Sequence, residues 1–187
     1  MAYIEVIEHP KAEGQLKEIY DGLVQSRGKL AEVHKIQSLN PESITNHMDL
    51  YMTIMFGKSP LKRYQREMIA VIVSSSNECP YCIRHHGDAL NHFWKDQKKV
   101  DELANNYSQL DLSDLEIALC KYAQDLTLKP NSINEQEHTQ KLKELGLEDR
   151  AILDAALVIA YFNFVNRLVL GLGVQLEEEG GEGYKYD

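Results

Sequence analysis

Apolar residues recur at helical spacing along almost the whole chain, and this pattern constrains the fold more than any other feature. In residues 10–25, for example, Leu16, Ile19 and Leu23 fall on one face of a helix. No stretch of useful length alternates between apolar and polar residues as a half-buried strand does. The sequence therefore predicts an all-α fold.

Helix-breaking residues divide this pattern into segments. Asn40 followed by Pro41 is typical of a helix start, and Pro80 also suits the first turn of a helix. Gly146 suits the residue that follows a helix end. We predict helices at about residues 10–25, 41–56, 61–74, 80–94, 96–105, 113–128, 134–145 and 149–170.

A chain of 187 residues suits one helical domain, and the composition changes only near the C-terminus. Residues 177–187 carry five acids and one lysine among glycines, without a periodic pattern. We predict a single domain over residues 1–176 and a flexible acidic tail over residues 177–187. Within the domain, a weak sequence echo between residues 79–87 and 162–171 indicates two pseudo-repeated helical lobes.

The formal net charge of −9 argues against nucleic acid or an anionic membrane as a partner. The N-terminus lacks the basic and then apolar pattern of a signal peptide. The most apolar stretch, residues 152–174, is interrupted by Asp154 and Arg167, so we interpret it as a buried helix and not as a membrane span. We expect a cytoplasmic protein, in which a close cysteine pair is typically catalytic, redox-sensing or metal-binding.

Residues 79–86, with the sequence CPYCIRHH, hold the groups that thiol redox chemistry needs. Cys79 and Cys82 are close enough in sequence to form a disulfide with little backbone movement. His86 lies one helical turn beyond Cys82, and Glu67 of the preceding helix can orient it. Both thiols would lie at a helix N-terminus, where unsatisfied N–H groups favour an anion.

These groups predict a reaction with a hydroperoxide. The thiolate of one cysteine attacks the distal oxygen and becomes a sulfenic acid, the other cysteine forms a disulfide with it, and an external dithiol reduces the disulfide. In thioredoxin-like motifs the first cysteine is usually the nucleophile, which would be Cys79. The position of His86 favours Cys82 instead, and we assign the attack to Cys82.

A glutamate, eleven residues and then Cys-x-x-Cys-x-x-x-His on a helical chain of this size resemble the alkylhydroperoxidase D branch of the carboxymuconolactone decarboxylase-like family, and its peroxidase-related subgroup in particular. The matching positions are Glu67, Cys79, Cys82 and His86. The resemblance implies an AhpD-like helical bundle, a homo-oligomer, and thiol-dependent peroxidase activity in antioxidant defence. It also implies attack by Cys82, proton relay by Glu67 and His86, no bound cofactor, and electrons from a lipoyl-bearing protein.

One position departs from the family pattern. The residue before the second cysteine is a histidine in the family and Tyr81 here, so the relay loses one candidate base, although the Tyr81 hydroxyl can still donate a hydrogen bond. Decarboxylation in the parent family does not depend on the cysteine pair. The motif therefore argues against that activity.

Other functions of the motif are also possible interpretations of the sequence. A lone pair of cysteines is half of a zinc site, but structural zinc needs four ligands, and Cys120 in its apolar context is predicted to be core. A redox sensor without turnover and a general disulfide oxidoreductase also fit. His85 and Arg84 are candidates for supporting roles around the thiols, and Arg84 can equally pair with an acid elsewhere.

One polar and one apolar cluster outside the motif each allow two interpretations. Asn163, Asn166 and Arg167 either form a hydrogen-bond network between helices or line a pocket over the thiols. The apolar cluster at residues 51–56 is core or subunit interface, or else a wall of the hydroperoxide pocket. Continuous apolar character over residues 151–165 exceeds one buried stripe, which predicts self-association as a dimer, trimer or hexamer.

Overall fold

The structure is a computed structural model that describes residues 2–177, and helices are the regular elements of this part of the chain. The predicted all-α fold is confirmed. The α-helices are α1 (Gly14–Arg27), α2 (Glu32–Lys35), α3 (Pro41–Tyr51), α4 (Arg63–Ser76), α5 (Pro80–Trp94), α6 (Gln97–Asn106), α7 (Asp114–Leu128), α8 (Lys141–Glu144) and α9 (Asp149–Leu172). Two π-helical segments, η2 (Met52–Phe56) and η5 (Glu135–Gln140), adjoin α3 and α8. Short 3₁₀ helices are η1 (His9–Lys11), η3 (Tyr107–Gln109) and η4 (Pro130–Ser132).

Local sequence signals account for several helix ends. α5 begins at Pro80, as predicted, and α7 begins after a capping box made by Ser113 and Glu116. α9 ends before Gly173, whose φ of 67° lies in the left-handed region that favours glycine. The four-residue helix α2 was not predicted, because so short a segment shows no periodic pattern.

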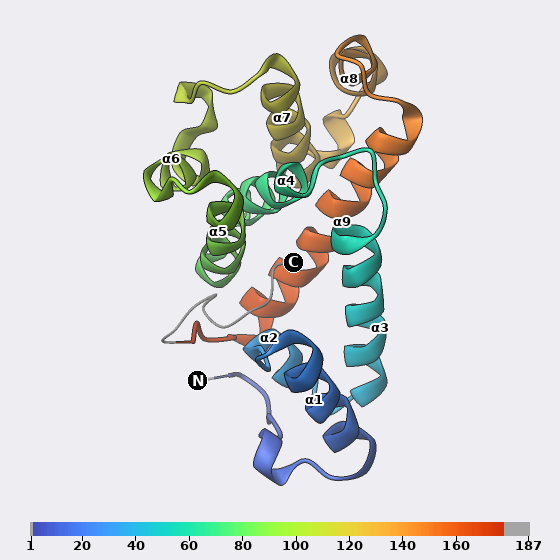
Figure 1. Cartoon of the computed structure of the whole chain (residues 1–187), viewed down its shortest axis with the longest axis vertical. Helices are drawn as coiled ribbons and strands as arrows, with labels where there is room; N and C mark the ends of the chain where they lie inside the picture. The colour runs from blue at the N-terminus through green and yellow to red at the C-terminus, as the bar shows by residue number, and fades with distance from the viewer. Residues whose placement is uncertain (1, 178–187) are drawn as a thin grey trace.

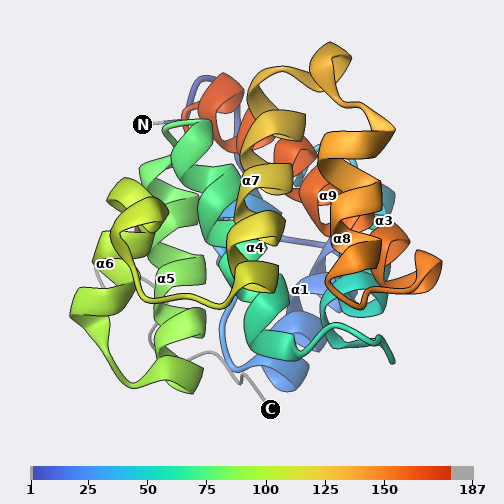
Figure 2. The ribbon, with the colours of Figure 1, turned by 90° about the horizontal axis from the view of Figure 1, so that it is seen from above.

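Helix α9 runs through the middle of the molecule (Figure 1). It packs against α4 and α7, and it also contacts α2 and η2 from the N-terminal part of the chain. α4 packs on α5, and α5 on α6, so these three helices follow one another away from α9 in the view from above (Figure 2). α4 and α9, which are far apart in sequence, therefore meet along one interface.

Two hydrophobic clusters fill the interior. The larger cluster joins α4, α7 and α9 and includes Met68, Ile69 and Phe162, whereas the smaller one lies between α1 and α3 around Tyr20 and Ile44. The ring of Tyr51 packs against both clusters. Helices α1 and α3 therefore share a small core of their own, whereas Val33 of α2 packs in the larger cluster.

The two halves of the predicted sequence echo lie in different structural contexts. The turn between α4 and α5 contains Glu78 at a φ of 53°, and it separates the thiols from the preceding helix. α9 instead runs unbroken through Phe162, so the second half of the echo contains no such turn. The similarity between residues 79–87 and 162–171 is thus confined to the residue pattern.

α9 is long and apolar enough to cross a membrane by length and composition alone, a test that a core helix of a globular protein also passes. Its Val158, Ile159 and Phe162 side chains are buried in the larger cluster, in agreement with the predicted buried helix. The opposite face keeps apolar side chains exposed, with Leu153 53% and Phe164 46% accessible. α9 therefore has a core face and an uncovered apolar face.

The predicted acidic tail is described only at its first residue. Glu177 is placed by hydrogen bonds with the backbone N–H of Glu32 and with the side chains of Tyr81 and His85. Residues 178–187 lie outside the described residues.

Candidate active site

The two predicted thiols lie side by side at the start of α5. Cys79 is the N-cap residue, Cys82 lies in the first turn, and both are buried. Their Sγ atoms are 2.7 Å apart, and a disulfide bond measures about 2.05 Å. Little movement is needed to join them, as their spacing predicted.

The two thiols titrate as a coupled pair. The hydrogen bond between the sulfur atoms lowers the pKa of Cys79, whose thiolate it stabilises, and raises the pKa of Cys82, with burial adding to that rise. A hydrogen bond with the Asn166 side chain opposes the rise at Cys82. The first negative charge of the pair is therefore favoured on Cys79, and transfer of the shared proton along the hydrogen bond moves it to Cys82.

Glu67 and His86 make the contact that the sequence predicted. Glu67 of α4 is fully buried, and its Oε2 lies 2.8 Å from Nδ1 of His86 on α5. Arg63, one turn earlier on α4, donates to Oε1 of Glu67. Burial alone would raise the pKa of Glu67, but the hydrogen bond with His86 and the charges of His86 and Arg63 lower it. In the neutral form of the His86 ring, an ionised Glu67 holds the ring proton on Nδ1 and leaves Nε2 as an acceptor.

His86 lies near the thiols without bonding to them. Its ring packs edge-on against Phe162, with the ring centroids 4.3 Å apart. Within residues 2–177, no hydrogen bond joins His86 to Cys79 or Cys82, so the predicted direct reach of His86 to Cys82 is not seen. Both His86 and Cys82 line one cavity, where a bound molecule can bridge them.

A cavity of about 90 Å³ lies in front of Cys82. The α2–α3 region walls it on one side, and α5 and α9 wall it on the other. Cys82 lines this cavity, whereas Cys79 lies behind it in the core. Rings from Tyr51, Tyr161 and Phe162 make much of the wall apolar. Of the two sulfur atoms, that of Cys82 is therefore the one that a substrate in the cavity would meet.

Two buried histidines of the cavity have no carboxylate partner among the described residues. Burial lowers the pKa of His34 on α2 to about 3 and that of His47 on α3 to about 4, so both rings are neutral near pH 7. Nδ1 of His34 has no hydrogen-bond partner in the described part of the chain. His47 uses both nitrogens, one with Gln37 at 2.8 Å and one with Tyr161 at 2.6 Å.

Tyr81 and His85 support the site from its edge. The Tyr81 hydroxyl accepts from the backbone N–H of Val33 at 3.3 Å and donates to Glu177 at 3.1 Å. His85 Nε2 lies 2.8 Å from the other oxygen of Glu177, and its ring lies 4.3 Å from that of Tyr81. Both line the cavity, but the Tyr81 hydroxyl is bonded to the C-terminal segment and not to a thiol. Burial would raise the pKa of Glu177, yet its hydrogen bonds lower it to about 2.

The polar residues of α9 form the predicted hydrogen-bond network between helices, and they are not among the residues that line the cavity in front of Cys82. Asn77 donates to the side-chain oxygens of Asn163 and Asn166 at 3.1 Å each, and Arg167 donates to Asn163 at 2.7 Å. This network ties α9 to the turn between α4 and α5. Fully buried Asn166 also reaches Cys82, so part of the network lies against the thiols.

Two residues near the motif lie away from its chemistry. Arg84 is exposed and pairs with Asp88 at 2.9 Å, so the acid elsewhere is its observed partner. Cys120 is fully buried in the core of α7, as predicted, and burial raises the pKa of its thiol. Among the described residues, no group of three or more His, Cys, Asp or Glu side chains is placed to hold a metal ion.

Residues 41–125 match the model of the Carboxymuconolactone decarboxylase family. The resemblance to this family is confirmed. The matched region contains the four motif residues and His47, but it ends before α9, which supplies Tyr161 and Asn166 to the site. No curated protein matches the sequence.

Several solved structures share the fold of this chain at low sequence identity. A peroxidase-related protein from Silicibacter sp. TM1040 is 27% identical with a TM-score of 0.84, over 97% of this chain and 95% of that one. A peroxidase-related AhpD core protein from Ralstonia eutropha JMP134 is 23% identical with a TM-score of 0.86, over 96% and 94%. The debrominase Bmp8 is 22% identical with a TM-score of 0.77, over 92% and 91%. The fold is thus AhpD-like.

Sequence reasoning did not find His34, His47 or Tyr161. His47 and Tyr161 are 114 positions apart, and neither belongs to a spaced motif. A single histidine or tyrosine on a helix gives no local sign of whether it faces a cavity. The one available signal was the group of polar residues in the apolar helix α9, which marks the face that meets the thiols.

Proposed function

We propose that this protein reduces organic hydroperoxides with the thiols of Cys82 and Cys79. The observation that carries the proposal is the exposure of Cys82, but not of adjacent Cys79, to a cavity that His86 also lines. A substrate in that cavity can meet the attacking sulfur and a proton carrier together, with the second sulfur 2.7 Å behind.

The first step oxidises Cys82. His86 Nε2 takes one proton from the thiol pair, and the remaining hydrogen bond lets the negative charge move to Cys82. The Cys82 thiolate attacks the distal oxygen of the hydroperoxide, the O–O bond breaks, and Cys82 becomes a sulfenic acid. The leaving oxygen takes the proton from His86 and departs as an alcohol. Glu67 and Arg63 remain charged and hold the His86 ring throughout.

The second step closes the disulfide. The Cys79 sulfur attacks the sulfenic sulfur of Cys82, an S–S bond forms, and the hydroxyl leaves as water with the last thiol proton. An external dithiol, of the lipoyl type that the resemblance implies, then reduces the Cys79–Cys82 disulfide and becomes a disulfide itself. A cytoplasmic location supplies such reductants.

The first experiment is mass analysis of the reduced, metal-free protein before and after one equivalent of an organic hydroperoxide. We expect a loss of two hydrogens and a peptide pair linked through Cys79 and Cys82. Cys82→Ser should abolish peroxide consumption, and Cys79→Ser should leave a sulfenic acid on Cys82. Cys120→Ser is the matched control and should react like the wild type. Two free thiols after exposure would refute the proposal, and reversed variants would give the attack to Cys79.

Turnover separates an enzyme from a redox sensor. Both form the disulfide, but a peroxidase consumes many equivalents of hydroperoxide when a dithiol such as dihydrolipoamide is supplied. Reaction of the disulfide with dithiol substrates and no reaction with peroxide would instead favour a general disulfide oxidoreductase.

The ring-lined wall of the cavity favours a second candidate, reductive dehalogenation of an aromatic substrate. Two thiols and an aryl bromide would give the disulfide, the dehalogenated ring and hydrogen bromide, and Bmp8, which shares the fold, is named a debrominase. Bromide release from a bromopyrrole, without peroxide consumption, would favour this reaction over the first.

The uncovered face of α9 supports a homo-oligomer. Leu153, Leu157 and Phe164 are between 41% and 53% exposed, and they recur at helical spacing. We propose that a second copy of the chain covers this face. Leu157→Glu should reduce the mass measured by light scattering to that of a monomer, whereas Lys98→Glu on the exposed part of α6 should not.

A further inference from the structure

The Tyr161 hydroxyl has one hydrogen-bond partner among residues 2–177, Nε2 of His47 at 2.6 Å. We propose that the Tyr161 hydroxyl donates a hydrogen bond to the leaving oxygen of a hydroperoxide attacked by Cys82, and that His47 and Gln37 fix the direction of this donation. The inference rests on the proposed function and adds to it a side chain that contacts the substrate.

The orientation of the Gln37 amide is set by its neighbours. Its Nε2 lies 2.8 Å from the backbone oxygen of Val33, which can only accept a hydrogen bond. Its Oε1 accepts from the Ser43 hydroxyl at 3.4 Å. The second hydrogen of Gln37 Nε2 is therefore available for His47 Nδ1, 2.8 Å away.

The Gln37 amide in turn sets the tautomer of His47. Because Gln37 donates, Nδ1 of His47 must accept. Burial keeps the pKa of His47 near 4, so the ring is neutral and carries its one proton on Nε2. Nε2 lies 2.6 Å from the Tyr161 hydroxyl oxygen, so His47 donates and Tyr161 accepts.

Tyr161 then has its own proton left to donate. Its ring is 5% exposed, packs edge-on against Phe162 at 5.0 Å between centroids, and lines the cavity together with Cys82. Burial and the neighbouring Tyr51 and Cys82 hold its pKa well above the usual value, so the hydroxyl stays protonated. A molecule that enters the cavity can supply the missing acceptor.

The chemistry of the first step creates such an acceptor. When the O–O bond breaks, negative charge develops on the oxygen that leaves. Tyr161 keeps its proton and stabilises this charge through a hydrogen bond, while the proton that completes the alcohol comes from His86. A preorganised donor at a developing oxyanion typically contributes about 10²–10³-fold in rate.

This role selects a class of substrate. The alkoxide from an alkyl hydroperoxide is a strongly basic leaving group and gains most from a donor. The carboxylate from a peracid leaves easily and gains little. Tyr161 thus adapts the site to alkyl hydroperoxides, and its loss should affect the two oxidants unequally.

The experiment measures single-turnover formation of the Cys79–Cys82 disulfide in wild type, Tyr161→Phe and Tyr107→Phe. Tyr107 is the matched control, because its hydroxyl is also hydrogen-bonded to a side chain, that of Gln124 at 3.2 Å, but lies away from the cavity. The oxidants are tert-butyl hydroperoxide and peracetic acid, and alkylation by iodoacetamide reports thiolate reactivity without a leaving oxygen. Thermal unfolding shows whether each variant is folded.

We expect Tyr161→Phe to react about 10²-fold more slowly with tert-butyl hydroperoxide, with a much smaller loss for peracetic acid and unchanged alkylation. Tyr107→Phe should match the wild type throughout. Equal slowing of all three reactions would mean that the hydroxyl acts on the thiolate or the fold, and no slowing would mean that it has no role; either result overturns the inference and leaves the proposed function intact. A wild type that forms no disulfide with either oxidant overturns both.

Gln37→Glu tests the positioning role separately. A carboxylate cannot donate to Nδ1, so His47 should place its proton there and offer Nε2 as an acceptor. The Tyr161 proton would then turn toward His47 and away from the cavity. We expect the selective loss with tert-butyl hydroperoxide to match that of Tyr161→Phe, although the hydroxyl is still present. A wild-type ratio between the two oxidants in folded Gln37→Glu would refute the role of Gln37 and His47.

Discussion

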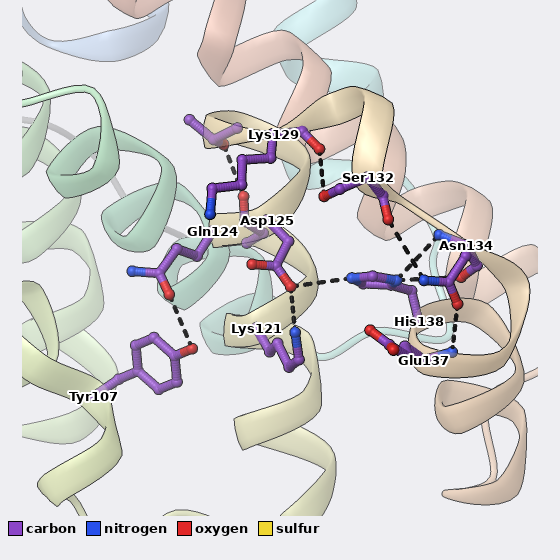
Figure 3. A network of polar contacts seen from close by, with 11 residues as sticks. Tyr107, Lys121, Gln124, Asp125, Lys129, Ser132, Asn134, Glu137 and His138 are labelled. Carbon is purple, nitrogen blue, oxygen red and sulfur yellow. Dashed lines mark hydrogen bonds and ion pairs between the residues drawn. The ribbon is translucent and has the colours of Figure 1, made fainter.

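Two histidine–carboxylate clusters in this protein share one arrangement and differ in their surroundings. Each has a basic residue, a carboxylate one turn later on the same helix, and a histidine from another segment. The members are Arg63, Glu67 and His86 on α4 and α5, and Lys121, Asp125 and His138 on α7 and η5 (Figure 3). Only the first cluster adjoins the thiols.

The two histidines use their nitrogens differently. His138 lies 3.1 Å from Asp125 through Nε2, which ties η5 to α7, and its Nδ1 lies 3.2–3.3 Å from the backbone of Asn134, the N-cap residue of η5 (Figure 3). Both nitrogens are therefore engaged. His86 bonds to Glu67 through Nδ1, and the described residues give its Nε2 no partner. A histidine–carboxylate pair is therefore available for proton transfer when one nitrogen remains open toward a cavity.

The largest expected difference between the clusters is in activity. Glu67→Gln should slow disulfide formation with hydroperoxide by on the order of 10²-fold, because His86 loses the carboxylate that fixes its tautomer. Asp125→Asn should leave the rate at the wild-type level. Single-turnover kinetics on both folded variants provide the measurement, and equal rates in the two would remove Glu67 from the relay.

Removal of the basic residues should affect stability unequally. Arg63→Met leaves fully buried Glu67 with one ionic partner fewer and should cost about 3 kcal/mol of unfolding free energy. Lys121 is half exposed, so Lys121→Met should cost about 0.5 kcal/mol or less. Urea unfolding of the two variants measures both values, and similar losses would contradict the difference in burial.

Substitution of His138 should mainly reduce stability, whereas substitution of His86 should mainly reduce activity. His138→Ala removes a buried ring with hydrogen bonds at both nitrogens and should cost about 2 kcal/mol of stability, while the folded fraction reacts normally. His86→Ala should abolish most of the activity at a smaller cost in stability. Loss of activity in folded His138→Ala would show that the α7 cluster also serves the reaction.

The pH dependence of stability should come from the cavity histidines, which lack a carboxylate partner among the described residues. The folded-state pKa values of His34 and His47, about 3 and about 4, lie below the ordinary value of 6.5. Below pH 6.5 the unfolded chain therefore binds more protons, and the free energy of unfolding falls as the pH drops toward 4. His34→Gln should make this slope shallower by about 1 kcal/mol per pH unit. An unchanged slope in urea unfolding at several pH values would show that His34 is protonated in the folded protein.

The comparison also shows which parts of the site local sequence determines. Helix ends follow from Pro80, the Ser113–Glu116 capping box and Gly173, because these signals act within a few residues. The closeness of Cys79 and Cys82 and their place at the start of α5 follow in the same way. Glu67 and His86 meet because α4 and α5 are consecutive and packed together, so their spacing predicted the contact.

Tertiary packing decided the rest, because it depends on residues that no local pattern connects. The sequence could not tell that α9 and the α2–α3 region close a cavity over Cys82 and not over Cys79. The sequence also could not show that His86 keeps one ring nitrogen without a partner among the described residues, whereas both ring nitrogens of His138 are hydrogen-bonded. The hydrogen bonds that join Tyr161 to His47 and His47 to Gln37 link α9 to residues more than a hundred positions away. By itself the sequence determined the helices and the close cysteine pair; the packing of distant helices determined which of the two sulfur atoms lines the cavity.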